Sequence, residues 1–206
     1  EHLMHQTWDE GTLVYTDYQT NGRGQLTNTW ESKAGKNILM SMYFAPLWLP
    51  IKDQFVLSQA VALGVVDCLR QYADGFQIKW PNDIYWKHQK IAGILIEYTG
   101  RFVVVGIGIN VNSNPTVDRY KTTKLDIYSE IPMNELLNRL MRNIDKWCRA
   151  DFRAVRARWT ELAGCLNRMV KYQGEPAELI GINENGALVL RRDTRYLLVY
   201  GDEITA

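Results

Sequence analysis

Apolar and polar residues alternate in several short runs in the first half of the chain, a pattern that predicts β-strands. We expect these strands at residues 12–16, 36–44, 76–80, 90–98 and 101–110. Between the second and third runs, from Ile51 to Tyr72, apolar residues instead recur at spacings near 3.6, which is typical of a helix with one face in the core. This half of the chain therefore predicts a sheet with a helix on one face.

A long helix is predicted in the second half of the chain, from about Met133 to about Ala163. Its apolar stripe consists of Leu137, Met141, Ile144, Cys148, Val155, Trp159 and Leu162. Basic residues recur along the same stretch at steps of three and four, which would place them on one side: Arg139, Arg142, Lys146, Arg149, Arg153 and Arg156. Such a row is either a solvated face or a docking surface for an acidic partner.

The period of the apolar pattern changes to two from Arg168 onward. Four short strand-like runs follow, at residues 169–173, 176–182, 187–191 and 196–200, and the turn-forming stretches GEP, NENG and DTR separate them. Short strands this closely spaced predict a small barrel. We therefore expect two domains, residues 1–163 and residues 164–206.

Composition and charge restrict the classes of function. The chain of 206 residues carries 24 Lys and Arg against 23 Asp and Glu. Its net charge is therefore too small to attract nucleic acid or an anionic membrane over a long range. No apolar run is long enough to cross a bilayer, and no signal peptide opens the chain. Cys68, Cys148 and Cys165 show no C-x-x-C spacing, which favours buried thiols in a reducing compartment. We expect a cytoplasmic protein that binds neither DNA nor membranes.

Two glycines flank Arg23 in the stretch NGRG, residues 21–24. Glycines let the backbone approach a ligand closely, and the guanidinium offers a planar pair of donors to an anion. A turn without any ligand explains the same residues, and the chain contains neither a P-loop nor a dinucleotide fingerprint. Trp30, a few residues further on, is either a core residue or a cover for a flat purine.

The stretch KWPND, residues 79–83, is more informative. Pro81 favours an extended conformation for the residue before it, so the sequence predicts that a strand ends at Trp80. Asn82 and Asp83 are then expected to form a turn. A connection between two strands with no ligand is the simplest interpretation.

Charged residues gather around this predicted turn. Lys79, Asp83 and Lys90 would lie at the ends of adjacent strands. Gly93 lacks a side chain inside the next strand, which leaves room for another group to approach. Together with Arg23, these residues predict a site for a polyanion.

Several stretches together resemble, in order and spacing, the catalytic domain of biotin-protein ligases: YQTNGRG and the following Trp30, KNILMSM, KWPNDIYW, KIAGILIE and VGIGINVN. The last part of the chain resembles the small C-terminal domain of that family. The resemblance is close over residues 12–112 and looser over residues 164–206. It implies an α+β fold, with a mixed sheet packed with helices as in class II synthetases, followed by a small SH3-like β-barrel.

The resemblance also implies an ATP-dependent reaction in two steps. Biotin would be activated as biotinyl-5'-AMP with release of pyrophosphate, and the biotinyl group would pass to a lysine of a biotin carboxyl carrier protein. ATP would bind together with Mg²⁺. We expect the monofunctional type of this ligase, without an N-terminal DNA-binding domain, as a monomer or weak homodimer.

The motifs of the family assign roles to residues of this chain. The candidate catalytic residues are Arg23 and Lys90, for the carboxylate and the α-phosphate, and Asp83, which would help to deprotonate the incoming lysine. The candidate biotin-binding residues are Gln19, Gly22, Arg23, Lys90 and Gly93. The candidate ATP-binding residues are Trp30, Lys79, Asn82, Lys90 and Asn110, and the Mg²⁺ that accompanies ATP is expected near Asn110.

Two departures from the family pattern leave alternatives open. Gln25 stands where the glycine loop of the family usually has a further arginine. No S-T-N segment occurs upstream, so we expect the N-terminal part of the first domain to be incomplete. The alternatives are a lipoate or octanoyl ligase, which shares the fold type, and a sensor that binds biotinyl-AMP without transferring it.

Overall fold

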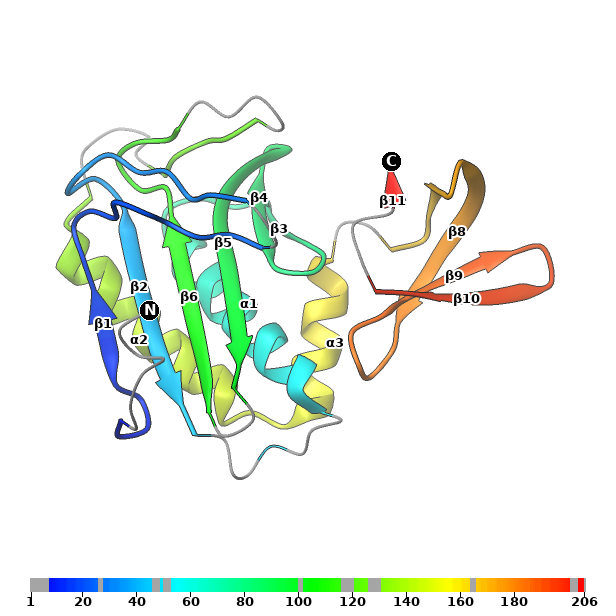
Figure 1. Cartoon of the computed structure of the whole chain (residues 1–206), viewed down its shortest axis with the longest axis horizontal. Coiled ribbons are helices and arrows are strands. Elements are labelled where there is room, and N and C mark those ends of the chain that lie inside the picture. The colour runs from blue at the N-terminus through cyan, green and yellow to red at the C-terminus, as the bar shows by residue number, and fades with distance from the viewer. Residues whose placement is uncertain are drawn as a thin grey trace.

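The structure contains two β-sheets (Figure 1). It is a computed structural model that describes residues 8–25, 28–45, 49, 53–99, 102–115, 121–125, 131–163, 166–200 and 204–205. The larger sheet has helices behind it, and the smaller sheet is formed by the C-terminal part of the chain and lies beside it. The predicted strands are present in both parts.

The larger sheet has six strands in the order β1-β2-β6-β5-β4-β3. Its strands are β1 (Leu13–Tyr15), β2 (Ile38–Phe44), β3 (Phe76–Lys79), β4 (Asp83–Trp86), β5 (Gln89–Tyr98) and β6 (Val103–Ile109). All five neighbouring pairs are antiparallel, so the prediction of a mixed sheet is wrong. Strands β3 to β6 follow one another through short connections, and short connections join antiparallel strands, because a parallel pair needs a long crossover.

Helices cover one face of the larger sheet (Figure 1). They are α1 (Gln54–Leu69), α2 (Met133–Cys148) and α3 (Phe152–Leu162). The prediction of one helix over 133–163 is wrong, because the side chain of Asp151 accepts hydrogen bonds from the backbone N–H groups of Arg153 and Ala154 and caps a new helix. No helix in the described ranges is both long and apolar enough to cross a lipid bilayer.

Helix α2 packs closely against α1. Its buried residues are Leu136, Leu140 and Ile144, whereas Leu137 of the predicted stripe is only partly buried. A Cβ atom at Gly64 of α1 would lie 2.7 Å from the Cα atom of Ile144, so the absence of a side chain permits this approach. The true stripe of α2 is therefore rotated relative to the predicted one.

The basic row predicted on one long helix is divided between α2, its C-cap residue Arg149, and α3. Four of its members form ion pairs: Arg139 with Glu135, Lys146 with Asp67, Arg149 with Asp145, and Arg156 with Asp53. These pairs favour the interpretation as a solvated face, since much of the charge is already compensated within the chain.

Two of the three thiols lie in the described part of the chain, and both are free. Cys68 is buried, as predicted, and Cys148 is half-buried. Burial raises the pKa of the Cys68 thiol to about 12, and burial likewise raises the pKa of the Cys148 thiol to about 12. Cys165 lies outside the described residues.

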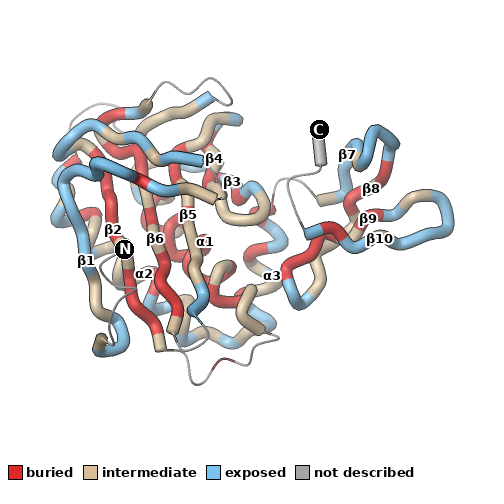
Figure 2. Tube along the Cα trace, viewed as in Figure 1, coloured by how far each residue is buried: buried red, intermediate tan, exposed pale blue. Residues whose placement is uncertain are grey.

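The smaller sheet is antiparallel and has five strands in the order β10-β9-β8-β7-β11. They are β7 (Arg168–Tyr172), β8 (Glu175–Ile182), β9 (Leu188–Arg192), β10 (Arg195–Val199) and β11 (Ile204–Thr205). A small core of its own includes Ala177, Leu179, Leu188, Leu190 and Val199. Figure 2 shows this core as a buried stretch along β8 and β9, separate from the larger core between the six-stranded sheet and the helices.

Candidate functional site

A cavity of about 680 Å³ lies on the face of the larger sheet that the helices leave uncovered. Successive residues of a strand point to opposite faces, and alternate residues in the central part of three strands line the cavity: Leu39 and Ser41 of β2, Gly93, Leu95 and Glu97 of β5, and Val104, Gly106 and Gly108 of β6. Ser41 faces Gly106 across β2 and β6, and Gly93 faces Gly108 across β5 and β6. Small residues at these positions leave the floor open to a ligand or to another side chain.

The indole ring of Trp30 lies on the glycines of this floor. A Cβ atom at Gly108 would lie 2.4 Å from Cε2 of Trp30, and a Cβ atom at Gly93 would lie 3.1 Å from its Cζ3. The indole N–H is buried and donates no hydrogen bond. Gly93 thus makes the room that the sequence predicted, and in this structure Trp30 fills part of it.

The glycine loop forms a small hairpin beside the cavity. The backbone N–H of Trp30 donates to the carbonyl oxygen of Gly22 at 2.9 Å, and that of Gly24 donates to Asn28 at 2.8 Å. A Cβ atom at Gly22 would lie 2.2 Å from the carbonyl oxygen of Trp30. The space at Gly22 is therefore used by the chain itself, and Gly22 does not line the cavity, in contrast to the predicted biotin contact.

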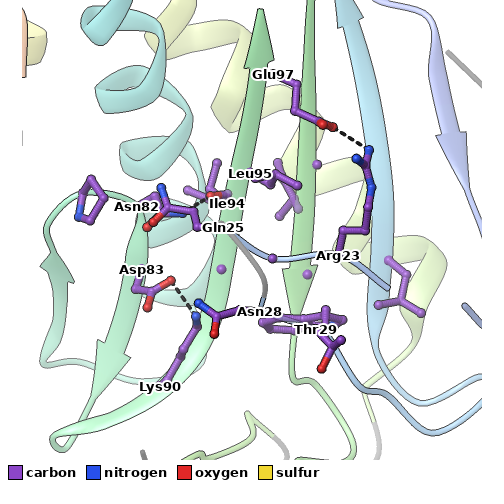
Figure 3. A pocket seen from close by; sticks show the side chains of 18 of the residues that line it. Arg23, Gln25, Asn28, Thr29, Asn82, Asp83, Lys90, Ile94, Leu95 and Glu97 are labelled. Atoms are coloured by element: carbon purple, nitrogen blue, oxygen red, sulfur yellow. Dashed lines mark hydrogen bonds and ion pairs between the residues drawn. The ribbon is translucent and has the colours of Figure 1, made fainter. Parts of the chain in front are cut away.

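Arg23 points from this hairpin toward β5 and forms an ion pair there (Figure 3). Its Nη2 atom lies 2.8 Å from Oε2 of Glu97, and the two side chains are 43% and 27% exposed. Both residues line the cavity. The guanidinium is thus held at the cavity by a carboxylate that the sequence did not predict as part of the site.

A second ion pair lies elsewhere in the cavity, between Lys90 and Asp83 (Figure 3). Nζ of Lys90 is 2.7 Å from Oδ1 of Asp83, and the two side chains are only 13% and 21% exposed. Asp83 is the first residue of β4, opposite Lys79, and does not belong to the turn as predicted. The backbone pairing of β3 with β4 explains the difference, because it continues through Asp83.

The turn between β3 and β4 is fixed to the sheet through Asn82. The side-chain amide of Asn82 donates to the carbonyl oxygen of Ile94 on β5, and the backbone N–H of Ile94 donates to the carbonyl oxygen of Asn82 at 3.0 Å. Lys79 lies beside this turn, with its Nζ 5.2 Å from the centre of the Tyr85 ring. Lys79, Lys90 and the polar turn therefore do meet on one side of the cavity, whereas Arg23 lies apart from them with Glu97 (Figure 3).

The position of Asn110 does not agree with its predicted role in ATP binding. It is only 1% exposed and is absent from the cavity lining. Its Oδ1 atom makes no hydrogen bond. The described residues contain no group of three His, Cys, Asp or Glu side chains that could hold a metal ion.

Eight of the ten predicted site residues line the cavity, all except Gly22 and Asn110. A model of the biotin/lipoate A/B protein ligase family matches residues 1–114, which is more than half of the chain. The chain belongs to this family. The resemblance found in the sequence is thereby confirmed.

Several members of the family are similar to this chain. The bifunctional ligase/repressor BirA of Bacillus subtilis is 42% identical over 120 residues, which are 55% of this chain and 36% of that protein. BirA of Escherichia coli is 29% identical over 201 residues, which are 89% of this chain and 62% of that protein. This chain therefore spans less than two thirds of the length of either relative.

Solved structures of biotin protein ligases share the fold. The biotin protein ligase from Aquifex aeolicus in complex with biotin and ATP gives a TM-score of 0.83 at 24% identity, over 99% of this chain and 92% of that chain. The enzyme from Leishmania major in complex with biotinyl-5-AMP gives a TM-score of 0.68 at 24% identity, over 93% and 89%. At this identity the likeness concerns the fold alone.

For this member of the biotin/lipoate A/B protein ligase family, sequence reasoning missed part of the cavity. The missed residues include Ser41, Glu97, Gly106 and Gly108 of the larger sheet and Val170, Leu179 and Leu188 of the smaller sheet. A signal for the floor was present, because Gly106 and Gly108 alternate inside an otherwise apolar strand. No local pattern signals the three apolar residues, since the packing of the two sheets brings them to the cavity.

Proposed function

We propose that the protein activates biotin with ATP to form biotinyl-5'-AMP and then transfers the biotinyl group to a lysine of a biotin carboxyl carrier protein. The observation that carries the proposal is the cavity on the larger sheet. Glycines form part of its floor, and two cations, Arg23 and Lys90, line it at separate positions. Family membership and the biotin protein ligases of the same fold support it.

The first step requires positive charge in the cavity. A carboxylate oxygen of biotin attacks the α-phosphorus of ATP, the bond to the β-phosphate oxygen breaks, and pyrophosphate leaves. Negative charge accumulates on the phosphorus substituents in the transition state, and preorganised cations stabilise it. We assign this role to Arg23 and Lys90, with Lys79 nearby.

The second step requires a neutral amine. The lysine of the carrier reacts at the carbonyl carbon of biotinyl-5'-AMP, an amide bond forms, and AMP leaves. An ammonium group has no free electron pair, so a base must accept its proton. We assign this role to Asp83, which lines the cavity beside Lys90.

Magnesium is expected to enter with the nucleotide. The carboxylates of the cavity, Asp83 and Glu97, are each paired with a cation in this structure. The phosphate oxygens of ATP are hard ligands that suit Mg²⁺, which binds proteins mostly together with such phosphates. The free Oδ1 of Asn110 is one oxygen that the chain could add, if the side chain turns toward the cavity.

We further propose the domain division at residues 163 and 164, with residues 1–163 as the catalytic domain and residues 164–206 as an SH3-like barrel. The five-stranded sheet with its own small core supports this division. In this view the smaller domain borders the cavity and contributes to the docking surface for the carrier. The cytoplasmic location, the absence of DNA binding and the state of monomer or weak homodimer remain predictions.

The deciding experiment measures transfer. The full-length natural chain is incubated with ATP, Mg²⁺, a carrier domain and either labelled biotin or labelled lipoate. We expect covalent labelling of the carrier with biotin, and only when ATP is present. Labelling of the carrier with lipoate but not with biotin would show that the protein is a lipoate ligase.

The same experiment separates a ligase from a sensor. Pyrophosphate release without labelling of the carrier would mean that the protein makes biotinyl-AMP and does not transfer it. The glutamine at position 25, where the family resemblance predicts a further arginine, is the reason to test for this outcome. A matched reaction with Gln25→Arg then shows whether the loop residue is the cause.

A further inference from the structure

Trp80 connects the two sheets of the molecule. Its side chain packs against the core of the larger sheet and also against the core of the smaller one. Its indole N–H donates to the carbonyl oxygen of Gly186 at 2.8 Å, on the turn between β8 and β9. A residue inside the KWPND stretch thus makes its hydrogen bond to the C-terminal sheet.

The turn that receives this bond, residues 183–187, has a fixed conformation. Oδ1 of Asn183 accepts hydrogen bonds from the backbone N–H groups of Asn185, at 3.1 Å, and Ala187, at 2.9 Å. Gly186 has a φ of +86°, which a residue with a side chain rarely adopts. The turn is therefore held together by its own hydrogen bonds.

The 183–187 turn also contacts the helices behind the larger sheet. A Cβ atom at Gly186 would lie 2.5 Å from Cδ2 of Phe55 in α1, so the backbone of the turn packs directly on that ring. Arg156 of α3 pairs with Asp53 at 2.7 Å and with Glu184 of the turn at 3.5 Å. Trp80 is the contact among these that also lines the cavity.

The smaller sheet supplies one wall of the cavity, through Val170, Leu179 and Leu188. Leu188 follows the 183–187 turn directly and is 1% exposed. A bond that fixes Gly186 consequently fixes where this apolar wall stands. On the other side, the turn that contains Trp80 is held to β5 through Asn82.

We propose that Trp80 is a positioning residue: its bond to Gly186 holds the apolar wall of the smaller sheet against the cavity, so that the wall keeps a constant place relative to Lys79 and Asp83. The effect on catalysis rests on the proposed function. The effect on the 183–187 turn is independent of the proposed function, because it is measured without any substrate.

The test compares two conservative variants. Trp80→Phe keeps an aromatic ring between the two cores and removes the N–H donor. Trp86→Phe is the matched control, because the indole N–H of Trp86 donates to the carbonyl oxygen of Asp74 at 2.9 Å and the residue does not line the cavity. Each variant loses one bond of the same kind, so we expect similar decreases in melting temperature.

Hydrogen exchange of the free protein is the first measurement. Trp80→Phe should accelerate exchange of the amides in residues 183–192 by about fivefold, the scale of one lost hydrogen bond, and Trp86→Phe should leave them unchanged. Equal exchange in the wild type and Trp80→Phe would overturn the proposal. If Trp80→Phe does not fold, the indole N–H proton of Trp80 in the unmodified chain must exchange as slowly as the amides of the turn, and fast exchange overturns the proposal.

Steady-state transfer of biotin is the second measurement. In Trp80→Phe, a displaced wall should raise the KM for ATP or the KM for the carrier by about fivefold and change kcat by less than twofold. In Trp86→Phe, both KM values and kcat should match those of the wild type. An unchanged KM in a variant with accelerated exchange would show that the wall has no influence on the site, and the proposal would fail. If the wild type transfers nothing, the proposed function fails, and the exchange result still decides the role of the bond.

Discussion

Neutralising Glu97 should strengthen the binding of an anionic ligand at Arg23. In the structure, Oε2 of Glu97 accepts a hydrogen bond from Nη2 of Arg23 at 2.8 Å. A ligand carboxylate or phosphate that binds this guanidinium must replace the carboxylate of Glu97 or share the guanidinium with it. The substitution Glu97→Gln keeps the size of the side chain and removes the competing charge.

The size of the effect follows from the exposure of the pair. Arg23 and Glu97 are 43% and 27% exposed, so water and salt screen their attraction, and such pairs contribute about 0–1 kcal/mol. Releasing Arg23 can therefore lower the Kd of the anion by at most about fivefold. The melting temperature should change little.

Titration calorimetry with biotin at low and physiological salt measures this effect. The control is Glu178→Gln, which removes the partner of Arg191 in an ion pair away from the cavity, and which should leave the Kd unchanged. Weaker binding of biotin to Glu97→Gln would refute the reasoning, because Glu97 would then hold Arg23 in its productive position and would not compete for it. A gain above about tenfold would equally refute it, since an exposed pair cannot supply that much.

Three further predictions concern other parts of the molecule. Lys90→Ala should lower pyrophosphate release by about two to three powers of ten through loss of one charged donor, whereas the exposed Lys87→Ala should react at the wild-type rate. Gly108→Ala places a methyl group 2.4 Å from the Trp30 ring and should lower the free energy of unfolding in urea by about 1–3 kcal/mol, and Gly181→Ala, with open space around it, should cost much less. Burial raises the pKa of the Cys68 thiol from 9.0 to about 12, so the stability that the protonated thiol contributes is complete below pH 9 and is lost as the pH rises toward 12. Urea unfolding between pH 8 and 11 checks this. In Cys68→Ala the free energy of unfolding should decrease less steeply as the pH rises.

Local sequence patterns predicted the part of the site that local backbone pairing builds. Lys79, Asp83, Lys90 and Gly93 lie on consecutive strands joined by short turns, so their proximity follows from the strand pattern. The pattern could not give the partner of Arg23, because Glu97 is 74 positions away in the sequence and comes close only through the pairing of the whole sheet.

Other differences have physical causes of the same kind. The break between α2 and α3 depends on one capping carboxylate at Asp151, which a search for apolar periodicity does not detect. The family resemblance implies that Asn110 binds ATP, whereas its side chain lies buried outside the cavity lining. The apolar wall from Val170, Leu179 and Leu188 depends on how the two sheets pack, and no local signal encodes that packing.

The strand order of the larger sheet has a consequence for the route by which the protein folds. Strands β3, β4, β5 and β6 are neighbours in sequence as well as in the sheet, so they can form as successive hairpins. Strand β2 pairs with β6, although α1, β3, β4 and β5 lie between them in the sequence, and contacts so distant in sequence form slowly. Because Ser41 and Gly106 meet only through that pairing, we expect the cavity floor to be completed late, after the hairpins on which Lys90 and Asp83 lie. A newly made chain would acquire its cation–carboxylate pair before it had a place to bind anything.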